Sequence, residues 1–127
     1  MTNKPVISIY SFGFNHGGVD DANIIYDVSF LESPKNNKEY NNLDGLDQRV
    51  KEWILKNNKS QEFIRNFSKI LRETVTGYFN SGKPNITIAI GSDEGKHRAP
   101  VIVHEIASKL EDKNWKVVEW HRDILKK

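Results

Sequence analysis

The strongest candidate for a binding site in this sequence is a turn that contains two glycines and three adjacent cationic or titratable side chains. Gly91 and Gly95 permit backbone conformations that are closed to other residues, and Lys96-His97-Arg98 follows directly. The apolar run before the turn is typical of a buried strand, and the pattern after it is typical of a helix. Backbone N–H groups and the helix dipole attract negative charge at such a helix start. The turn therefore predicts an anion site, most simply for phosphate. The alternative is a strand–turn–helix connection that binds nothing.

Two acidic residues in the same turn oppose that prediction. Asp93 and Glu94 bring negative charge next to the expected anion. Each carboxylate within ~6 Å of a phosphate costs on the order of 1 kcal/mol at intermediate dielectric. Both side chains can instead point outward, or accept hydrogen bonds from sugar hydroxyls or an amino group. Their placement therefore decides what the turn can hold.

Two further polar segments follow predicted strands. The apolar alternation over residues 6–14 ends in a loop that contains His16, and the run 115–120 is followed by His121-Arg122-Asp123. Because the ligand crevice of a parallel sheet lies at the carboxyl ends of its strands, we expect these segments to share one edge with the turn 91–98. The alternative for His16 is an ordinary solvated loop histidine.

The elements that position these loops follow from the hydrophobic pattern. Strands are predicted at 6–14, 24–28, 86–90 and 115–120, and helices at 48–56, 60–80 and 98–112. Asp47 stands at an N-cap position, and the apolar stripe of the helix 60–80, which includes Ile70, is expected to face the core. The polar, asparagine-rich stretch 33–42 is expected as a surface loop. This order predicts an α/β sandwich with a largely parallel sheet, formed by one domain over residues 1–127.

The composition excludes several classes of site. The 127 residues contain no cysteine, which rules out disulfides, thiolate zinc sites and a cysteine nucleophile. The four histidines lack metal-ligand spacing such as i and i+4, so we expect no metal and no cofactor. The sequence has neither a long apolar segment nor a basic-then-apolar leader, and we expect a soluble, cytoplasmic protein that does not enter a membrane. The formal net charge of +2 is too small to indicate nucleic acid by itself.

Enzymatic chemistry remains an alternative. Ser92 and Arg98 have the spacing of the phosphate loop of cysteine phosphatases, with a serine in place of the thiolate. A serine lacks the low pKa that lets a thiolate attack at neutral pH. A phosphoester-acting enzyme would use this loop with His97 or His16 as acid–base. The kinase-like tripeptide at 121–123 has no glycine-rich nucleotide loop before it and no Asp-Phe-Gly after it.

Five motifs occur together in a fixed order. They are the residues 11–17 (Ser-Phe-Gly-Phe-Asn-His-Gly), 26–31 (Tyr-Asp-Val-Ser-Phe-Leu) with Pro34, 45–47 (Gly-Leu-Asp), 90–98 with its Gly-Lys-His-Arg, and 121–123 (His-Arg-Asp). Over residues 6–127 this sequence resembles the C-terminal domain of the RNase adapter protein RapZ, the YvcJ family. The family loop reads Cys-Thr-Gly-Gly-Lys-His-Arg-Ser, whereas this sequence has Ser-Asp-Glu-Gly-Lys-His-Arg-Ala at 92–99. We expect none of the ATP or GTP hydrolysis of the family's N-terminal domain.

The resemblance implies a fold like a phosphofructokinase subdomain and a non-catalytic sensor or adapter domain. Its implied partners are glucosamine-6-phosphate, small regulatory RNA, an endoribonuclease and further copies of the chain. On the matching positions, the phosphorylated metabolite would be held by His16, Ser92, Asp93, Glu94, Gly95, Lys96, His97 and Arg98. RNA would face Lys96, His97, Arg98, Lys113, Arg122, Lys126 and Lys127. The acidic residues in the loop predict a ligand that differs from the family's, and a pure RNA-binding module is the remaining alternative.

Overall fold

The central feature of the fold is a parallel sheet, which the computed structural model of this protein describes within residues 3–126. The strand order is β2-β3-β1-β4, and each neighbouring pair is parallel. The strands are β1 (Val6–Gly13), β2 (Ile24–Asp27), β3 (Asn85–Ser92) and β4 (Lys116–His121). The helices are α1 (Gln48–Leu55), α2 (Asn58–Asn80) and α3 (Arg98–Leu110), with 3-10 turns η1 (Phe14–His16) and η2 (Pro34–Asn36). The predicted α/β sandwich is confirmed.

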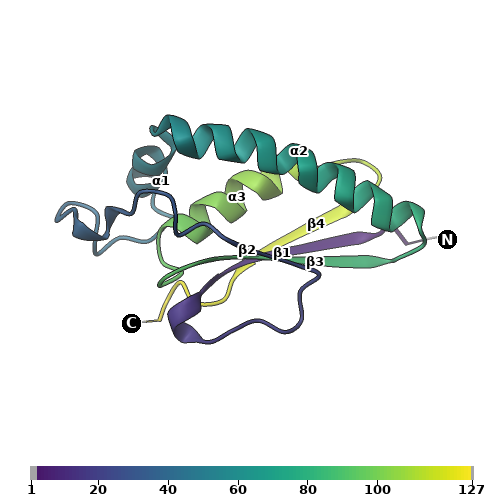
Figure 1. Ribbon diagram of the computed structural model, residues 1–127, viewed down its shortest axis with the longest axis horizontal. Helices are drawn as coiled ribbons and strands as arrows, with labels where there is room; N and C mark the ends of the chain where they lie inside the picture. The colour runs from purple at the N-terminus through teal and green to yellow at the C-terminus, as the bar shows by residue number, and fades with distance from the viewer. Residues whose placement is uncertain (1–2, 127) are drawn as a thin grey trace.

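All three helices lie on one face of the sheet, with the long α2 running across it (Figure 1). The strands alternate, so that every second side chain points to the helices. The main core forms between this face and α2 and α3. Its members include Ile7, Ile9, Ile86, Ile88, Ile90, Phe67, Leu71, Val75, Ile102 and Ile106.

The other face of the sheet is covered only in part. The chain that leaves β1, residues 14–23, loops beneath it (Figure 1) and contributes Val19 and Ala22 to a small cluster with Tyr10, Phe12 and Ala89. The inner strands β1 and β3 are therefore buried on both faces, as the apolar run 86–90 predicted. The outer strands β2 and β4 keep apolar side chains exposed on this face.

The helix starts follow local side-chain hydrogen bonds. Asp47 accepts the Arg49 N–H at 2.9 Å and caps α1 as predicted. Asn57 accepts the Lys59 N–H at 2.8 Å, so α2 begins two residues earlier than its apolar pattern indicates. The apolar pattern predicts Ile70 on the inward stripe of α2, and this prediction is wrong because the side chain is 58% exposed. The buried stripe of α2 consists of Ser60, Ile64, Phe67, Leu71 and Val75.

Candidate functional site

Three loops meet at the carboxyl edge of the sheet. The register places Gly13 beside Ser92 and Ser11 beside His121. Because β1, β3 and β4 are parallel and end together, the loops that follow them lie at one edge, as the sequence predicted. This edge also receives the N-terminus of α3 and the segment before α1 (Figure 1).

The backbone of residues 93–97 lies directly against the end of β1. Gly95 has a φ of 72°, which favours glycine, and a Cβ added to it would lie 2.5 Å from the Gly13 nitrogen. A Cβ added to Gly13 would collide with the Glu94 carbonyl. Neither position has room for a side chain, so these two glycines permit the close approach of loop and strand.

Successive backbone N–H groups of this loop are unpaired within the part of the chain that the structure describes. The N–H groups of residues 94–97 donate to no backbone acceptor within residues 3–126. The loop leads into α3, where the Ser92 hydroxyl accepts the Ala99 N–H at 3.3 Å. A helix N-terminus preceded by free N–H groups concentrates positive potential, which is the arrangement that binds anions.

The two carboxylates of the loop are directed to protein partners. Asp93 forms an ion pair with Arg98 at 3.4 Å between Oδ2 and Nη2. Glu94 accepts a hydrogen bond of 2.7 Å from the Asn15 amide and lies 3.8 Å from His16 Nε2. Each negative charge is therefore partly compensated within the protein, although both side chains remain about half exposed.

Arg98 attaches a second segment of chain to the loop. Its side chain is buried, and its Nη1 donates to the carbonyl oxygens of Ser29 at 2.6 Å and Leu31 at 3.1 Å. Buried hydrogen bonds from a charged donor are among the stronger ones in proteins. The first residue of α3 thus fixes the course of the chain between β2 and η2, which forms the opposite wall of the site.

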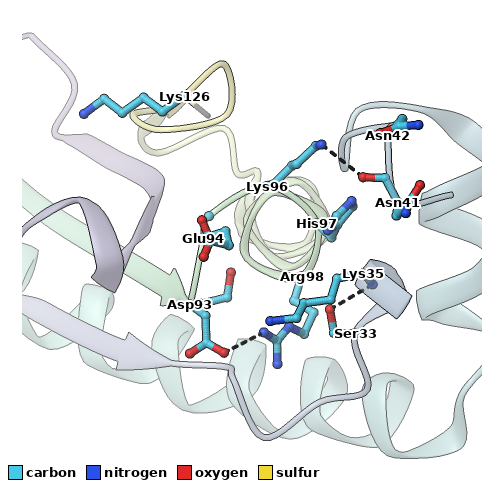
Figure 2. Close-up of a pocket in the computed structure, with 12 residues that line it drawn as sticks. Ser33, Lys35, Asn41, Asn42, Asp93, Glu94, Lys96, His97, Arg98 and Lys126 are labelled. Atoms are coloured by element: carbon cyan, nitrogen blue, oxygen red, sulfur yellow. Dashed lines mark hydrogen bonds and ion pairs between the residues drawn. The ribbon is translucent and has the colours of Figure 1, made fainter. Parts of the chain in front are cut away.

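A cavity of about 510 Å³ lies between these walls (Figure 2), a size that suits a small ligand. Lys96 Nζ donates to the Asn41 carbonyl at 3.0 Å and so links the two walls. The cavity is lined by Ser33, Lys35, Asn41, Asn42, residues 92–98 and Lys126. Its cationic groups come from Lys35, Lys96, Arg98 and Lys126. The residues from 33–42 are the part of the wall that the sequence reasoning missed. Their position after a strand of the same sheet was the available signal.

The residues that form this edge of the sheet belong to a stretch of sequence that is similar to known proteins. Residues 5–125 match the family model described as the RapZ C-terminal domain. The chain belongs to the RapZ C-terminal domain family. Its curated relatives are called nucleotide-binding proteins; those of Limosilactobacillus reuteri and Thermotoga neapolitana are 36% and 38% identical over 120 residues, and that of Clostridium novyi is 34% identical over 124 residues. These matches cover 94–98% of this chain but only 41–43% of the relatives, so the chain spans about two-fifths of their length.

Not every predicted site residue of this RapZ C-terminal domain reaches the cavity. Residues 92–98 line it together, but His16 does not. His16 lies in η1, behind the loop, where its Nε2 faces the Glu94 carboxylate. The structure therefore places His16 as a neighbour of a lining residue.

His97 is a titratable residue of the cavity wall, and its surroundings shift the pKa of its side chain. Burial lowers the pKa of its imidazole, and the adjacent charges of Lys96 and Arg98 lower it further. The ring is therefore neutral at pH 7. Its Nε2 is buried and has no hydrogen-bond partner among the residues that the structure describes.

The basic residues expected to face RNA are dispersed. Lys113 lies between α3 and β4, at the amino end of the sheet, away from the cavity. The Arg122 guanidinium donates to Asp123 and to the carbonyl oxygens of Gly17 and Gly18, which makes it a clamp on the loop after β1. Lys126 pairs with Asp123 at 2.8 Å and lines the cavity. Lys127 lies outside the described residues.

Residues 3–126 share two general features. None of their helices combines the length and the apolar character that crossing a membrane requires. Within the same range, histidine, aspartate and glutamate side chains form no group of three that is placed to bind a metal ion.

Proposed function

We propose that this domain, as a single unit, is a non-catalytic sensor that binds a small phosphorylated metabolite in the cavity of Figure 2. The observation that carries the proposal is the set of unpaired N–H groups at residues 94–97, at the N-terminus of α3 and in the cavity wall. A phosphate accepts several hydrogen bonds at once and gains from the helix dipole. The 13-residue length of α3 supports that contribution.

The charges of the cavity favour a ligand with two chemically different ends. The cations of Lys35, Lys96 and Lys126 suit a phosphate. The half-exposed carboxylates of Asp93 and Glu94 suit hydroxyl or amino groups at the other end. An amino-sugar phosphate, which the family resemblance implies, has both ends. The acidic pair replaces a Thr and a Gly of the family loop, and we propose that it adjusts which sugar is preferred.

Catalysis is the weaker proposal for this loop. The Ser92 side chain is only 2% exposed, and its hydroxyl accepts a hydrogen bond from the first turn of α3. A nucleophile needs an accessible oxygen and an adjacent base, whereas this hydroxyl performs the work of a helix cap. A phosphoester-acting enzyme would have to use His97 alone.

The larger context is proposed from family membership. We propose a cytoplasmic adapter that forms homo-oligomers and presents small RNA to an endoribonuclease, with Lys126 and Lys96 nearest to any RNA at the cavity mouth. The relatives are named nucleotide-binding proteins, but this chain covers about two-fifths of them. A nucleotide is therefore one of the competing ligands in the titration that tests the proposal.

Calorimetric titration of the purified chain tests the sensor proposal. The ligands are glucosamine-6-phosphate, glucose-6-phosphate, glucosamine, inorganic phosphate and ATP. We expect the sugar phosphates to bind, inorganic phosphate to bind more weakly, and glucosamine without phosphate to give no heat. Lys35→Ala should weaken binding about tenfold, the loss of one charge-assisted contact of about 1.4 kcal/mol.

Lys38→Ala is the matched control, because Lys38 is exposed on the same loop but does not line the cavity. It should bind like the unchanged chain. Absence of binding by every phosphorylated compound refutes the sensor proposal. Turnover of a phosphoester that persists in Ser92→Ala and disappears in His97→Ala would favour an enzyme. A gel shift with RNA that weakens steeply with salt, without metabolite binding, would favour the pure RNA module.

A further inference from the structure

One face of the parallel sheet lacks a covering layer. The helices cover the opposite face, and among the described residues 3–126 only the loop 14–23 passes beneath the inner strands on this face (Figure 1). Purely parallel sheets are normally covered on both faces. On the outer strands, Ile25 is 48%, Val118 37% and Trp120 41% exposed. The exposed apolar surface on β4 therefore lies directly beside an open edge of the sheet.

The edge of β4 has unpaired backbone groups in a defined register. The Lys116 N–H donates to Pro5 and the Arg122 N–H donates to Ser11, both at 2.9 Å. Residues 116, 118 and 120 therefore direct their backbone groups toward β1, while the alternate residues 117, 119 and 121 direct theirs outward. No other strand within residues 3–126 pairs with that side of β4.

The acidic charge of β4 is turned away from the edge, while the exposed Lys116 remains available at it. Glu119 accepts hydrogen bonds from His104 at 3.1 Å and His121 at 3.0 Å, and thus lies on the helix side of the sheet. Charged side chains that project from an edge strand normally discourage pairing with another strand. Here the Glu119 carboxylate is held within the protein and does not protect the edge.

We propose that a second copy of this chain pairs with the β4 edge in antiparallel fashion, with the two-fold axis at Val118. Val118 then lies opposite its own copy, Lys116 lies opposite the partner's Trp120, and Val117 lies opposite Glu119. The outward backbone groups of residues 117 and 119 fall in hydrogen-bonded pairs, and Val118 falls in a non-hydrogen-bonded pair, as the orientation of β4 requires. The four-stranded sheets of the two copies then form one continuous sheet.

The side chains fit this register, and one of the two neighbouring registers brings like charges together. Trp120 stacks on Tyr10 of its own sheet, with ring centroids 4.1 Å apart and an angle of 19° between the rings. Its outer indole surface is free to receive the Lys116 ammonium of the partner as a cation–π pair. A shift of two residues would place Glu119 opposite its own copy, and like charges directly opposite one another are destabilising. This self-complementarity identifies the occupant as a second copy.

The inference rests on the homo-oligomer of the proposed function but not on its ligand site. Because the chain has no cysteine, one substitution reports the register. Facing residues of a non-hydrogen-bonded pair have Cα atoms about 4.5 Å apart, within the range of a disulfide. Val118→Cys should therefore form a covalent dimer under mild oxidation. Ile25→Cys, on the opposite edge of the sheet and more exposed than Val118, should remain mainly monomeric.

Light scattering of the non-covalent protein completes the test. We expect twice the 14.7 kDa mass of one chain, and a return to one chain in Val118→Lys, which places two ammonium groups opposite each other. A dimer that persists in Val118→Lys, or equal cross-linking of the two cysteine variants, overturns this interface while the oligomer stands. If the unchanged chain is monomeric, both the β4 interface and the homo-oligomer are overturned, and a different partner would have to pair with this edge. Circular dichroism verifies that Val118→Lys is folded, and metabolite titration shows whether its ligand site persists.

Discussion

At the scale of single residues, Asp123 does the most to hold the site edge together. Its side chain is fully buried, and it accepts the Gly13 N–H at 2.8 Å and hydrogen bonds from Arg122. Lys126 adds an ion pair of 2.8 Å. Burial alone would raise the pKa of this carboxyl group, but the donors outweigh burial and lower it to about 2. The carboxylate thus fastens the end of β1 to the chain that follows β4.

Asp123→Asn should cost about 2 kcal/mol of unfolding free energy at pH 7, which corresponds to the shift from 3.8 to about 2. Since the folded pKa is depressed, the stabilisation is present above about pH 4 and disappears as the pH falls toward 2. Urea denaturation at several pH values measures this slope. It should be shallower in Asp123→Asn than in the unchanged chain and unaltered in Glu111→Gln, whose side chain is exposed. Parallel slopes in the unchanged chain and Asp123→Asn would contradict the assignment.

Gly95→Ala should destabilise the protein by about 2 kcal/mol or more, because the positive φ strains any other residue and the new Cβ approaches the Gly13 nitrogen. Gly18→Ala is the control, since a Cβ there meets nothing within 4 Å. Both free energies come from urea denaturation. Equal stability of the two variants would show that the loop is not packed against β1 as described.

At the scale of elements, the site depends on one helix start that organises two loops. The first residue of α3 binds the carbonyl groups after β2, and the Lys96 carbonyl accepts the Gly45 N–H at 2.8 Å. Residues 29–45 therefore take their course from the segment 96–98. Within the 33–42 stretch, Pro34 is buried and Tyr40 packs against a small core cluster. The hydrogen bonds from the segment 96–98 add to this packing and help to fix the position of the loop.

Arg98→Lys should loosen this wall without removing the charge, because an ammonium group cannot reproduce the paired contacts to Ser29 and Leu31. Hydrogen exchange measured by mass spectrometry should rise over residues 29–43 and remain unchanged in β1 and β3. Metabolite affinity should fall by about tenfold, or 1.4 kcal/mol. Unchanged exchange in 29–43 would mean that other contacts hold the loop.

At the scale of the whole molecule, the fold has two layers where a parallel sheet normally has three. The helix layer buries one face with apolar side chains from all four strands. The loop 14–23 protects the inner strands of the other face with a few small residues. The proposed pairing of two copies through β4 would cover exposed apolar surface without a further helix.

This pairing predicts that the melting temperature depends on protein concentration. A dimer that dissociates on unfolding gains stability by mass action, so a hundredfold increase in concentration should raise the melting temperature by roughly 5 °C. Differential scanning calorimetry measures it. Val118→Lys should have the same melting temperature at every concentration. A melting temperature of the unchanged chain that does not depend on concentration would contradict the dimer.

Much of this architecture could be predicted from the sequence, but the contacts that hold the second wall of the site could not. Strand and helix positions followed from periodicity, and the shared edge followed from the parallel order. The role of the 33–42 loop depends on Arg98 reaching residues almost seventy positions earlier, and no local pattern encodes such a contact. The prediction that Ile70 faces the core is wrong because apolar spacing along a helix does not reveal how wide the buried face of that helix is. The exposure of Val118 and Trp120 depends on which face the helices cover.

The unpaired N–H groups of residues 94–97 have a consequence for how this site can change over time. A backbone N–H is supplied by every amino acid except proline. Mutation can therefore replace the side chains of the loop, as the acidic pair at 93 and 94 illustrates, while the same donors stay in place. If the loop binds an anion as proposed, changes of its side chains can alter the preferred sugar while the backbone donors are kept. Proline is the one substitution that removes such a donor.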